Sequence, residues 1–330
     1  MEQVLEIRTF LFGCGGGDMQ KNSLFSKIKW FFLFIFSVSV YAQIPVTSNE
    51  DVIIAFSVDD NYATFIPVTI ESIKDYASPK RKYKIFILGN NISANHAHAI
   101  FQTQTENVTT QIIDIKDLIL KENIGSLKTL EHINTATYYR FFIPEVLQDY
   151  KKAVYLEADQ ILQADVAELY DTDLQGKSLG IAPQIKFSVT RSKEWFDYVQ
   201  KTLKMVKPNN YFNAGVLVMN LEKLRENDFR NKALKLAENN NFKYLDQDIL
   251  NSMFSDDCVR VEKEWNMEIF ILDLVRREYK PKLIHYTVGN LKPWRNSRPD
   301  EHTFRYSDLF WDYAKKTANY DEILQFAPKQ

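Results

Sequence analysis

The chain has 330 residues, of which 45% are hydrophobic, 25% charged and 14% aromatic, a composition typical of a globular protein with a substantial core. Its 41 basic and 43 acidic residues give a net charge of −2, which excludes the bulk positive charge of a nucleic-acid-binding protein. Two cysteines, Cys14 and Cys258, are too few for a disulfide framework and lack the spacing of metal ligands.

The N-terminal region has the pattern of an export signal. Basic residues precede "WFFLFIFSVSVYA" at 30–42, which is largely apolar. This run is shorter than the roughly 20 residues that a membrane-spanning helix needs, and it suits the core of a signal peptide. Val40 and Ala42 supply the small residues expected before a cleavage site at Gln43. Without cleavage, the run would act as an anchor that leaves the globular part outside.

We therefore expect residues 1–42 to be an N-terminal extension plus a signal peptide or membrane anchor. Residues 43–330 are expected to form a single domain with a helical C-terminal tail. The protein would then be exported or anchored in a secretory lumen or periplasm, with membrane association through residues 30–42. The alternative is a protein on the cytoplasmic face of the membrane.

From residue 51 the pattern alternates between buried strands and amphipathic helices. The first half predicts strands at 51–58, 82–88, 109–115 and 152–156, and helices at 65–76, 93–105 and 135–147. The second half predicts strands at 178–183, 213–221, 258–262 and 282–286, and helices around 221–240 and 246–254. Repeated strand–helix units indicate an α/β fold with a mostly parallel central sheet flanked by helices.

Two carboxylates end the apolar stretch "VYLEADQIL" at 154–162. Because alternate side chains of a strand share a face, Glu157 and Asp159 are expected to lie side by side. Unless a cation sits between them, one of the two should have a raised pKa and hold a proton. They also follow the carboxyl end of a strand, where open α/β sheets bind ligands.

Two further acidic segments have an ordinary structural interpretation. Asp59, Asp60 and Asn61 follow the first strand, and residues 246–248 ("DQD") precede an apolar helical pattern. Aspartate and asparagine commonly cap helices in such positions. Capping does not exclude a role at a site.

The segment "HYTVGNLKPW" at 285–294 combines a histidine that closes a strand with a glycine and a lysine. A lone histidine is more often structural than a ligand. Together with Glu157 and Asp159, however, His285 would complete an O,O,N ligand set suited to Mn²⁺ or Mg²⁺. Lys292 would lie near a phosphate held by that metal, and Gly289 permits close approach of the backbone.

Six segments, in this order, resemble glycosyltransferase family 8, and specifically its bacterial lipopolysaccharide galactosyl- and glucosyltransferases. The segments are "AFSVDDNYA", "TYYRFFIPEVL", "VYLEADQILQADVAELY", "YFNAGVLVMNL", "LDQDILN" and "HYTVGNLKPW". The resemblance extends from residue 51 to about residue 317. It implies a GT-A fold and an enzyme that transfers a hexose from a UDP-sugar to a glycan or glycolipid acceptor with retention of configuration.

The resemblance also implies roles for individual residues. The expected metal ligands, for Mn²⁺ or Mg²⁺, are Glu157, Asp159 and His285. The residues expected to bind the donor are Asp59, Asn61, Tyr62, Arg140, Asn213, Ala214, Gly215, Gly289 and Lys292. Asp246 and Gln247 are expected at the reaction centre. An amide is a poor nucleophile, so a front-face reaction, in which the departing diphosphate helps deprotonate the acceptor, and a covalent intermediate both remain open.

One residue departs from the family pattern. The first acid of the metal motif is usually aspartate, and here it is Glu157. Glutamate also binds hard cations, so we expect the metal to be retained. A catalytically weakened member of the family or a carbohydrate-binding protein is the alternative. A retaining glycosidase is a third hypothesis, because two carboxylates on one strand face could lie near the required separation of about 5 Å.

Residues 184–210 contain a mixture of basic and aromatic side chains. We expect this segment to fold over the donor site and to contribute to acceptor specificity. An ordinary amphipathic surface helix fits the same sequence.

Overall fold

The computed structural model describes residues 51–130, 134–184, 192–238, 242–269, 280–287, 289–299, 301 and 305–329. The expected signal or anchor in residues 1–42 therefore lies outside the described residues, as does the 185–191 part of the 184–210 segment. The described residues belong to one unit, Ser48–Gln330. Within them, no helix has the length and apolar character needed to cross a membrane.

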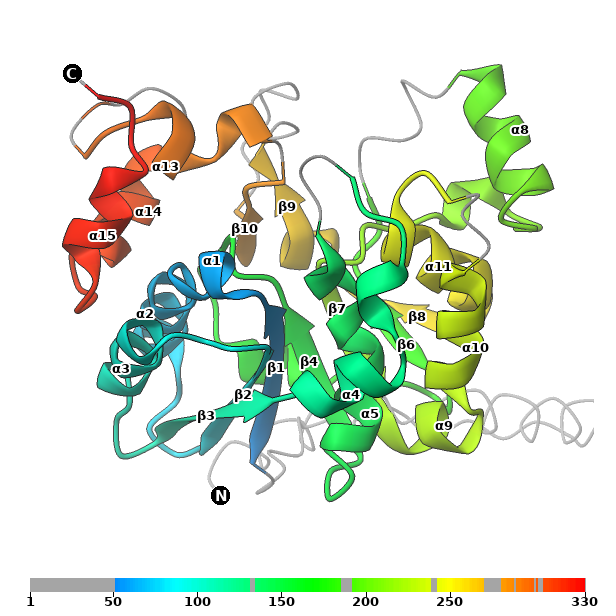
Figure 1. The fold of residues 1–330 in the computed structure, drawn as a ribbon, viewed down its shortest axis with the longest axis horizontal. Helices are drawn as coiled ribbons and strands as arrows, with labels where there is room; N and C mark the ends of the chain where they lie inside the picture. Colours follow the sequence, from blue (N-terminus) through cyan, green and yellow to red (C-terminus); the bar gives the residue numbers. More distant parts are fainter. Residues whose placement is uncertain are drawn as a thin grey trace, which may run out of the picture. The chain divides into compact units, whose positions relative to one another are not determined.

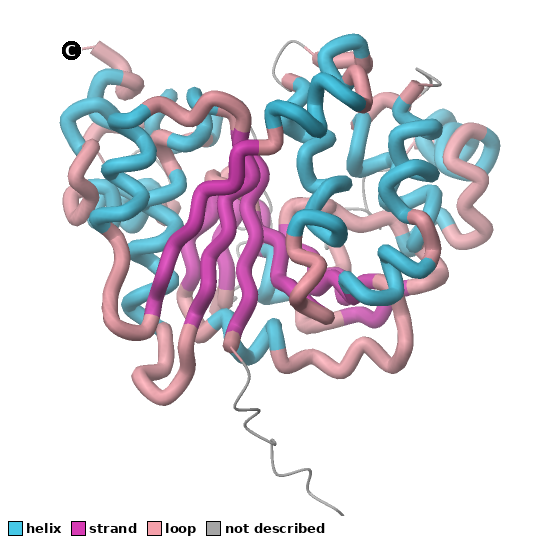
Figure 2. The backbone as a smooth tube through the Cα atoms, turned by 60° about the horizontal axis from the view of Figure 1, so that its bottom comes forward, coloured by secondary structure: helices cyan, strands magenta, loops and turns pink. Residues whose placement is uncertain are grey.

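The described strands form a seven-stranded sheet and a smaller three-stranded sheet (Figures 1 and 2). The large sheet has the order β3-β2-β1-β4-β7-β6-β8, and the small one the order β5-β10-β9. The strands are β1 Val52–Val58, β2 Tyr83–Gly89, β3 Val108–Asp114, β4 Lys152–Leu156, β5 Gln160–Leu162, β6 Leu179–Ile181, β7 Val216–Asn220, β8 Cys258–Arg260, β9 Met267–Glu268 and β10 Leu283–His285.

Helices cover both sides of the large sheet in Figure 2. In the first half they are α1 Asp60–Ala63, α2 Ile66–Tyr76, α3 Ala94–Gln102, α4 Lys116–Lys121, η1 Ile124–Ser126, η2 Thr135–Phe142, α5 Ile143–Val146 and α6 Val166–Tyr170. In the second half they are α8 Lys193–Lys201, η3 Pro208–Asn210, α9 Leu221–Glu226, α10 Phe229–Ala237, α11 Leu245–Phe254, η4 Lys263–Asn266, η5 Gly289–Leu291, α13 Pro293–Asn296, α14 Ser307–Ala314 and α15 Tyr320–Gln325. The predicted α/β architecture is confirmed.

The large sheet is mostly parallel, as predicted. Strand β1 pairs in parallel with both β2 and β4, and β2 pairs in parallel with β3. Strands β1, β2 and β4 are buried on both faces, which explains their largely apolar sequences, whereas β3 at the edge of the sheet is partly exposed. Within the described sheet, β7 alone runs against its neighbours, because it pairs antiparallel with β4 and β6.

The reversed direction of β7 positions the site. The register pairs Leu156 at the end of β4 with Val216 at the start of β7. The residues that follow β4 therefore meet the residues that precede β7 at one edge of the sheet. This is the edge where β1 also ends and where α/β sheets bind ligands.

Two local predictions are corrected. The stretch 154–162 is not one strand: β4 ends at Leu156, a turn follows, and β5 starts at Gln160 in the small sheet. The helix predicted at 135–147 is a 3-10 helix followed by one short α-helical turn. In both places the apolar residues show only that the segment is buried. The hydrophobic pattern does not show where one strand or helix ends and the next begins.

The C-terminal helices belong to the same core. Phe310 of α14 is buried, and its ring lies near those of Trp294 and Phe65, at centroid distances of 5.0 and 6.4 Å. Phe65 and Trp294 are themselves stacked at 4.0 Å. The Asn319 side chain donates a hydrogen bond of 2.9 Å to the carbonyl of Thr64. These contacts fix the start of α2, next to the segment that follows β1.

Candidate active site

A cavity of about 570 Å³ opens at the carboxyl edge of the parallel strands. All but two of the residues predicted for the site line it, and the exceptions are Asn61 and Gly215. The loops that contribute come from segments far apart in the sequence, after β1, β4 and β10 and before β7 and α11. The topology therefore brings the predicted residues to one place.

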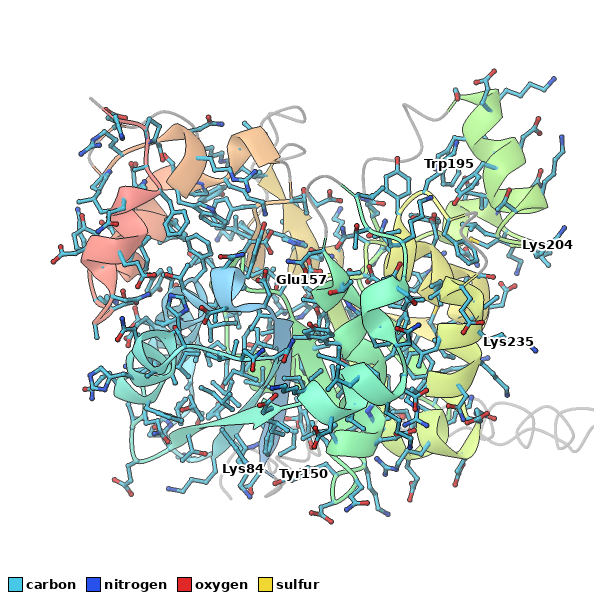
Figure 3. The ribbon with its side chains drawn as sticks, viewed as in Figure 1. Lys84, Tyr150, Glu157, Trp195, Lys204 and Lys235 are labelled. Atoms are coloured by element: carbon cyan, nitrogen blue, oxygen red, sulfur yellow. The ribbon has the colours of Figure 1, made fainter. Side chains whose placement is uncertain are left out.

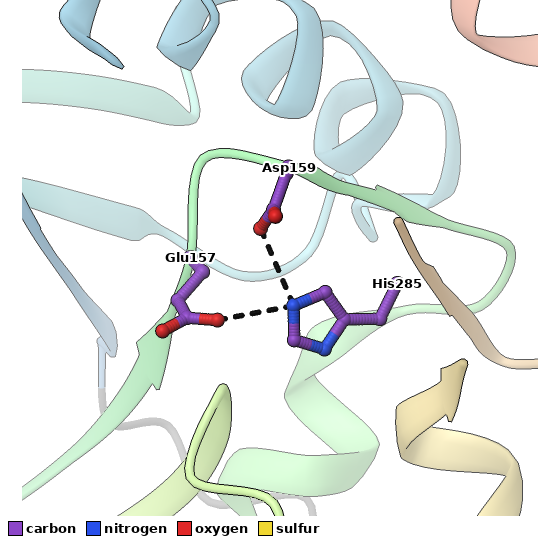
Figure 4. A group of neighbouring side chains, drawn as sticks. All are labelled: Glu157, Asp159 and His285. Carbon is purple, nitrogen blue, oxygen red and sulfur yellow. Dashed lines mark ion pairs between the residues drawn. The ribbon is translucent and has the colours of Figure 1, made fainter. Parts of the chain in front are cut away.

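The turn between β4 and β5 presents Glu157 and Asp159 to His285, the last residue of β10 (Figure 4). Nε2 of His285 lies 3.0 Å from a Glu157 oxygen and 3.3 Å from an Asp159 oxygen. The three ligand atoms lie within 4.8 Å of one another. The turn, not the pleat of a strand as expected, brings the two carboxylates together.

These three side chains fit a hard divalent cation. Two carboxylates and one imidazole are a ligand set that Mn²⁺ and Mg²⁺ accept. Gly215 leaves room beside them, because a Cβ atom there would lie 2.3 Å from Cε1 of His285 and 2.6 Å from Oε2 of Glu157. Nδ1 of His285 is hydrogen-bonded to Oδ1 of Asn266 at 2.8 Å, which orients the ring and directs Nε2 at the carboxylates.

Positively charged side chains lie beside Glu157 and Asp159. Burial opposes the ionisation of Asp159, but Lys292 and His285 outweigh burial and hold its pKa well below the usual range. Burial likewise favours a neutral His285, but Asp159 and Glu157 raise its pKa to about 9. Nζ of Lys292 donates to Asp159 and to the carbonyl of Tyr286. Without a bound metal, an imidazolium therefore supplies the positive charge between the two acids.

Glu157 is ionised for a similar reason. Burial raises its pKa, but His285 and Arg140 outweigh that effect and lower it overall. One carboxylate oxygen accepts a hydrogen bond of 2.8 Å from Arg140, and the other faces His285. A glycosidase needs one carboxyl group with a raised pKa as its general acid. Because the pKa values of both Glu157 and Asp159 are lowered, this pair does not meet that requirement.

Glu157, Asp159 and His285 are called the metal-type cluster below. Arg140 connects this cluster to Asp246. The guanidinium donates to Glu157 and to the carbonyl of Ala214, and its Nε lies 3.1 Å from an Asp246 oxygen. Asp246 also accepts a hydrogen bond from Thr137. Burial raises the pKa of Asp246 to about 6 despite the attraction of Arg140. Arg140 is itself buried over the Tyr155 ring, so its position is fixed.

Gln247 is held from both ends of its amide. Its Oε1 accepts a hydrogen bond of 3.2 Å from the backbone of Ala214, and its Nε2 donates to the Tyr211 hydroxyl at 2.9 Å. Tyr211 donates in turn to Asp248, which is fully buried. The segment "DQD" thus places Asp246 and Gln247 on the cavity while Asp248 supports the fold.

Asn213, which precedes β7, supports the metal-type cluster from the opposite side. Its Oδ1 accepts hydrogen bonds of 2.9 Å from the backbone of Gly215 and from the Asn266 side chain. Asn266 is the residue that orients His285. The sequence reasoning missed Asn266, and its signal was weak: an asparagine directly before the short strand that pairs with β10.

The segment after β1 forms another part of the cavity wall. Asp59 caps α1 by accepting a hydrogen bond from the backbone of Tyr62, and Asp59 and Tyr62 both line the cavity. Asn61 is exposed, and its side chain donates to Asp59 at 3.3 Å. Asn134, which was not predicted, lines the cavity and donates to the same carboxylate at 2.6 Å.

The segment after β10 adds positive charge. Lys292 is buried beside Asp159, whereas Arg295 is exposed and lines the cavity. Gly289 also lines the cavity, but a Cβ atom there would make only an ordinary contact of 3.6 Å with Arg295. The described neighbours of Gly289 therefore do not require a glycine at this position. Arg295 was not predicted, although its position directly after the "KPW" triplet is a signal in the sequence.

Comparisons with known proteins identify the family of the chain. The model of the family described as Glycosyl transferase family 8 matches residues 53–298. The chain is 30% identical over 292 residues to glycosyltransferase GlyF of Streptococcus pneumoniae, covering 84% of this chain and 67% of GlyF. It is 23% identical over 257 residues to the lipopolysaccharide 1,3-galactosyltransferase of Salmonella typhimurium, covering 74% of this chain and 73% of that enzyme.

Two solved structures share the fold. The bifunctional glycosyltransferase WbbM superposes with a TM-score of 0.70 at 27% identity, over 85% of this chain and 52% of WbbM. The galactosyltransferase LgtC, solved with donor and acceptor sugar analogues, gives 0.67 at 24% identity, over 80% of this chain and 96% of LgtC. This chain thus spans about half the length of WbbM. The expected GT-A fold is confirmed, and the chain belongs to glycosyl transferase family 8 and is a glycosyltransferase.

Proposed function

We propose that this glycosyltransferase moves galactose or glucose from a UDP-sugar to a glycan or glycolipid, with a divalent metal, Mn²⁺ before Mg²⁺, and with retention of configuration. The observation that carries the proposal is the convergence of Glu157, Asp159 and His285 at the cavity, with Lys292 beside them. The choice of hexose is supported by two similar proteins, the lipopolysaccharide 1,3-galactosyltransferase of Salmonella typhimurium and the lipopolysaccharide 1,2-glucosyltransferase of Escherichia coli.

The donor would lie across this edge of the sheet. Asp59 and Tyr62 would contact the uridine, and Lys292 and Arg295 would face the diphosphate. A metal held by Glu157, Asp159 and His285 would act as a Lewis acid on the negative charge that the diphosphate gains as it leaves. Arg140 and Asp246, which form a fixed pair, would orient the hydroxyls of the sugar.

The position of Gln247 favours the front-face route over a covalent intermediate. An amide is a poor nucleophile, and the hydrogen bond that Oε1 accepts from the Ala214 backbone occupies one of the two lone pairs of this oxygen. In the front-face route the bond between the anomeric carbon and the phosphate oxygen breaks, and a bond to the acceptor oxygen forms on the same face. The proton of the acceptor hydroxyl passes to an oxygen of the departing diphosphate. Gln247 would then position the sugar without becoming bonded to it.

The proposal is tested by UDP release from UDP-galactose and UDP-glucose. Release is expected with Mn²⁺, and it should fall to background with EDTA and in Asp159→Asn. Asp312→Asn is the matched control, because Asp312 is an exposed carboxylate outside the cavity lining and should leave release unchanged. Equal rates with EDTA would contradict the metal requirement, and no release from either donor would contradict the hexose.

The acceptor is proposed from the relative that acts on lipopolysaccharide, so a glycolipid is the first class to assay. An export signal or anchor in residues 1–42 is part of the same proposal, since a membrane-associated enzyme would meet such an acceptor. A mature N-terminus at Gln43 would support cleavage, and an intact chain that requires detergent would support an anchor. An intact chain that is soluble without detergent would contradict both.

A further inference from the structure

The cavity has a second end, beyond the metal-type cluster. On the nucleotide side, Lys292 lies 5.7 Å from the Tyr62 ring and is bonded to Asp159. On the other side, Gln247 donates to the hydroxyl of Tyr211, whose ring meets the ring of Trp195 edge to face at 5.6 Å. Along these contacts the cavity runs from Tyr62, past the metal-type cluster, to Trp195.

Figures 1 and 3 show the same order. In this view α1, which carries Tyr62, and Trp195 on α8 lie on opposite sides of Glu157. A nucleotide bound by Asp59 and Tyr62 with its diphosphate at the cluster would direct the sugar toward Gln247. A second substrate that reaches the reacting carbon would then enter from the side of Trp195.

Trp195 differs from the other tryptophans of the described residues. Trp265, Trp294 and Trp311 are 3%, 2% and 0% exposed, whereas Trp195 is half-buried and lines the cavity. Its helix has other residues for packing, because Tyr198 and Val199 of α8 are buried. The largest apolar side chain of α8 is therefore partly exposed at the cavity.

The same end of the cavity holds another exposed ring. Tyr244 lines the cavity, is 48% exposed, and directly precedes the helix that carries Asp246 and Gln247. Exposed aromatic rings beside hydrogen-bonding groups are suited to a sugar, because each pyranose ring has an apolar face of C–H groups and a rim of hydroxyls.

We propose that Trp195 is a specificity-determining residue whose ring stacks on the apolar face of a pyranose of the acceptor. The inference rests on the proposed function and names the acceptor class at that site: a carbohydrate with an accessible pyranose ring. The Trp195 ring then raises acceptor affinity and orients the attacking hydroxyl toward the sugar held at Gln247. It contributes nothing to binding of the nucleotide.

The first test uses fluorescence of the full chain in the presence of Mn²⁺ and UDP. The probes are lactose and the methyl glycosides of galactose, glucose and N-acetylglucosamine. At least one is expected to shift the tryptophan emission, and the shift should vanish in Trp195→Phe, which removes the reporting indole and keeps a ring. No shift with any probe, or a shift that persists in Trp195→Phe, would overturn the proposal.

The second test separates stacking from a structural role. Trp195→Ala is expected to raise the KM for the probe that binds by about tenfold or more, whereas Trp195→Phe should stay within about threefold of the parent. UDP affinity should be unchanged in both variants. The control is Phe196→Ala, which removes the neighbouring half-buried ring of α8 that does not line the cavity. An equal KM effect in Phe196→Ala, or a loss of UDP affinity in Trp195→Ala, would indicate disruption of α8 and overturn the proposal.

Measuring UDP binding by the parent protein separates a failure of this inference from a failure of the proposed function. Normal UDP binding without any glycoside signal overturns the role of Trp195 and leaves the transferase intact. A glycoside signal at Trp195 without UDP binding would support the sugar site and contradict the proposed UDP-sugar donor.

Discussion

Glu157 uses both oxygens of its carboxylate, and this explains why the longer side chain is compatible with the site. One oxygen accepts from Arg140 at 2.8 Å, and the other lies 3.0 Å from His285. The extra methylene lets one side chain reach both groups. The hypothesis of a weakened enzyme rests on Glu157 alone, and metal binding by Glu157→Asp tests it.

Glu157→Asp should therefore weaken metal binding rather than improve it. A shorter side chain from the same backbone position would withdraw a ligand oxygen from the space that it shares with Asp159 and His285, or would have to give up Arg140 to reach it. We expect Mn²⁺ affinity to fall by about tenfold, measured by calorimetry. Glu157→Asp with higher affinity and faster UDP release than the parent would support the weakened-enzyme hypothesis instead.

Gly215 gives a second test at the residue scale. In Gly215→Ala the new Cβ would overlap His285 and Glu157, at 2.3 and 2.6 Å. We expect Mn²⁺ affinity to fall by more than about tenfold, because the ligand side chains must move apart. Gly125→Ala is the matched control, since its Cβ would meet no atom within 4 Å. Unchanged metal binding in Gly215→Ala would show that the cation does not sit among these three side chains.

The sequence predicted which residues form the cluster but not how they are held. Asn266 orients His285, and Asn134 joins Asp59, through side-chain contacts between segments far apart in the chain. Such contacts depend on the tertiary fold, and a single asparagine at the end of a short 3-10 helix has no periodic pattern. Asn61 is the opposite case: it was predicted to bind the donor, but the structure leaves it exposed and outside the cavity lining.

At the scale of elements, β1, β2 and β4 were predictable because buried parallel strands are near-continuous apolar runs. The antiparallel direction of β7 was not predictable, since direction has no signature in such a run. The turn at 157–159 was not predicted, because Ile161 and Leu162 resume the apolar pattern of β4 two residues after Asp159 although they belong to the small sheet.

Three elements also meet at His96 of α3. Its Nδ1 lies 2.7 Å from Asp60 of α1, and its Nε2 lies 2.7 Å from Glu322 of α15. Both ring nitrogens must donate to satisfy two carboxylates, so the imidazolium is the form that joins the three helices. Burial lowers the pKa of His96, but Glu322 and Asp60 outweigh it and raise the pKa above its ordinary value of 6.5.

The stability of the protein should therefore depend on pH through His96. Because the folded-state pKa is raised, the contribution is fully present below about pH 6.5 and is lost as pH rises through the raised pKa. We expect His96→Gln to lower the free energy of unfolding by about 1 kcal/mol at pH 6 and by less at pH 9, measured by urea denaturation. A pH-independent difference between the two proteins would contradict the charged pairing.

At the scale of the whole molecule, the C-terminal helices lie outside the family match, which ends at residue 298. They nevertheless complete the core, because Phe310 packs against Trp294 and Phe65. The sequence predicted a helical tail. It did not predict that this tail supports the segment carrying Asp59 and Tyr62, since packing partners cannot be read from helical periodicity.

Phe310→Ala should lower the free energy of unfolding by about 3–5 kcal/mol, as expected for a fully buried phenylalanine. Thermal denaturation would measure the loss. Phe101→Ala is the control: Phe101 is 44% exposed, and its replacement should change stability by less than about 0.5 kcal/mol. Similar small effects in both variants would show that the tail is not part of the core.

We propose above that Glu157, Asp159 and His285 hold a divalent cation for the diphosphate of the donor. The most direct measurement is calorimetry of the full chain with UDP, with and without Mn²⁺, for the parent, Asp159→Ala and His285→Ala, with circular dichroism to verify folding. We predict that the parent binds UDP only with Mn²⁺ and that both folded variants lose this binding. UDP binding that needs no metal, or that survives in both variants, would contradict the claim.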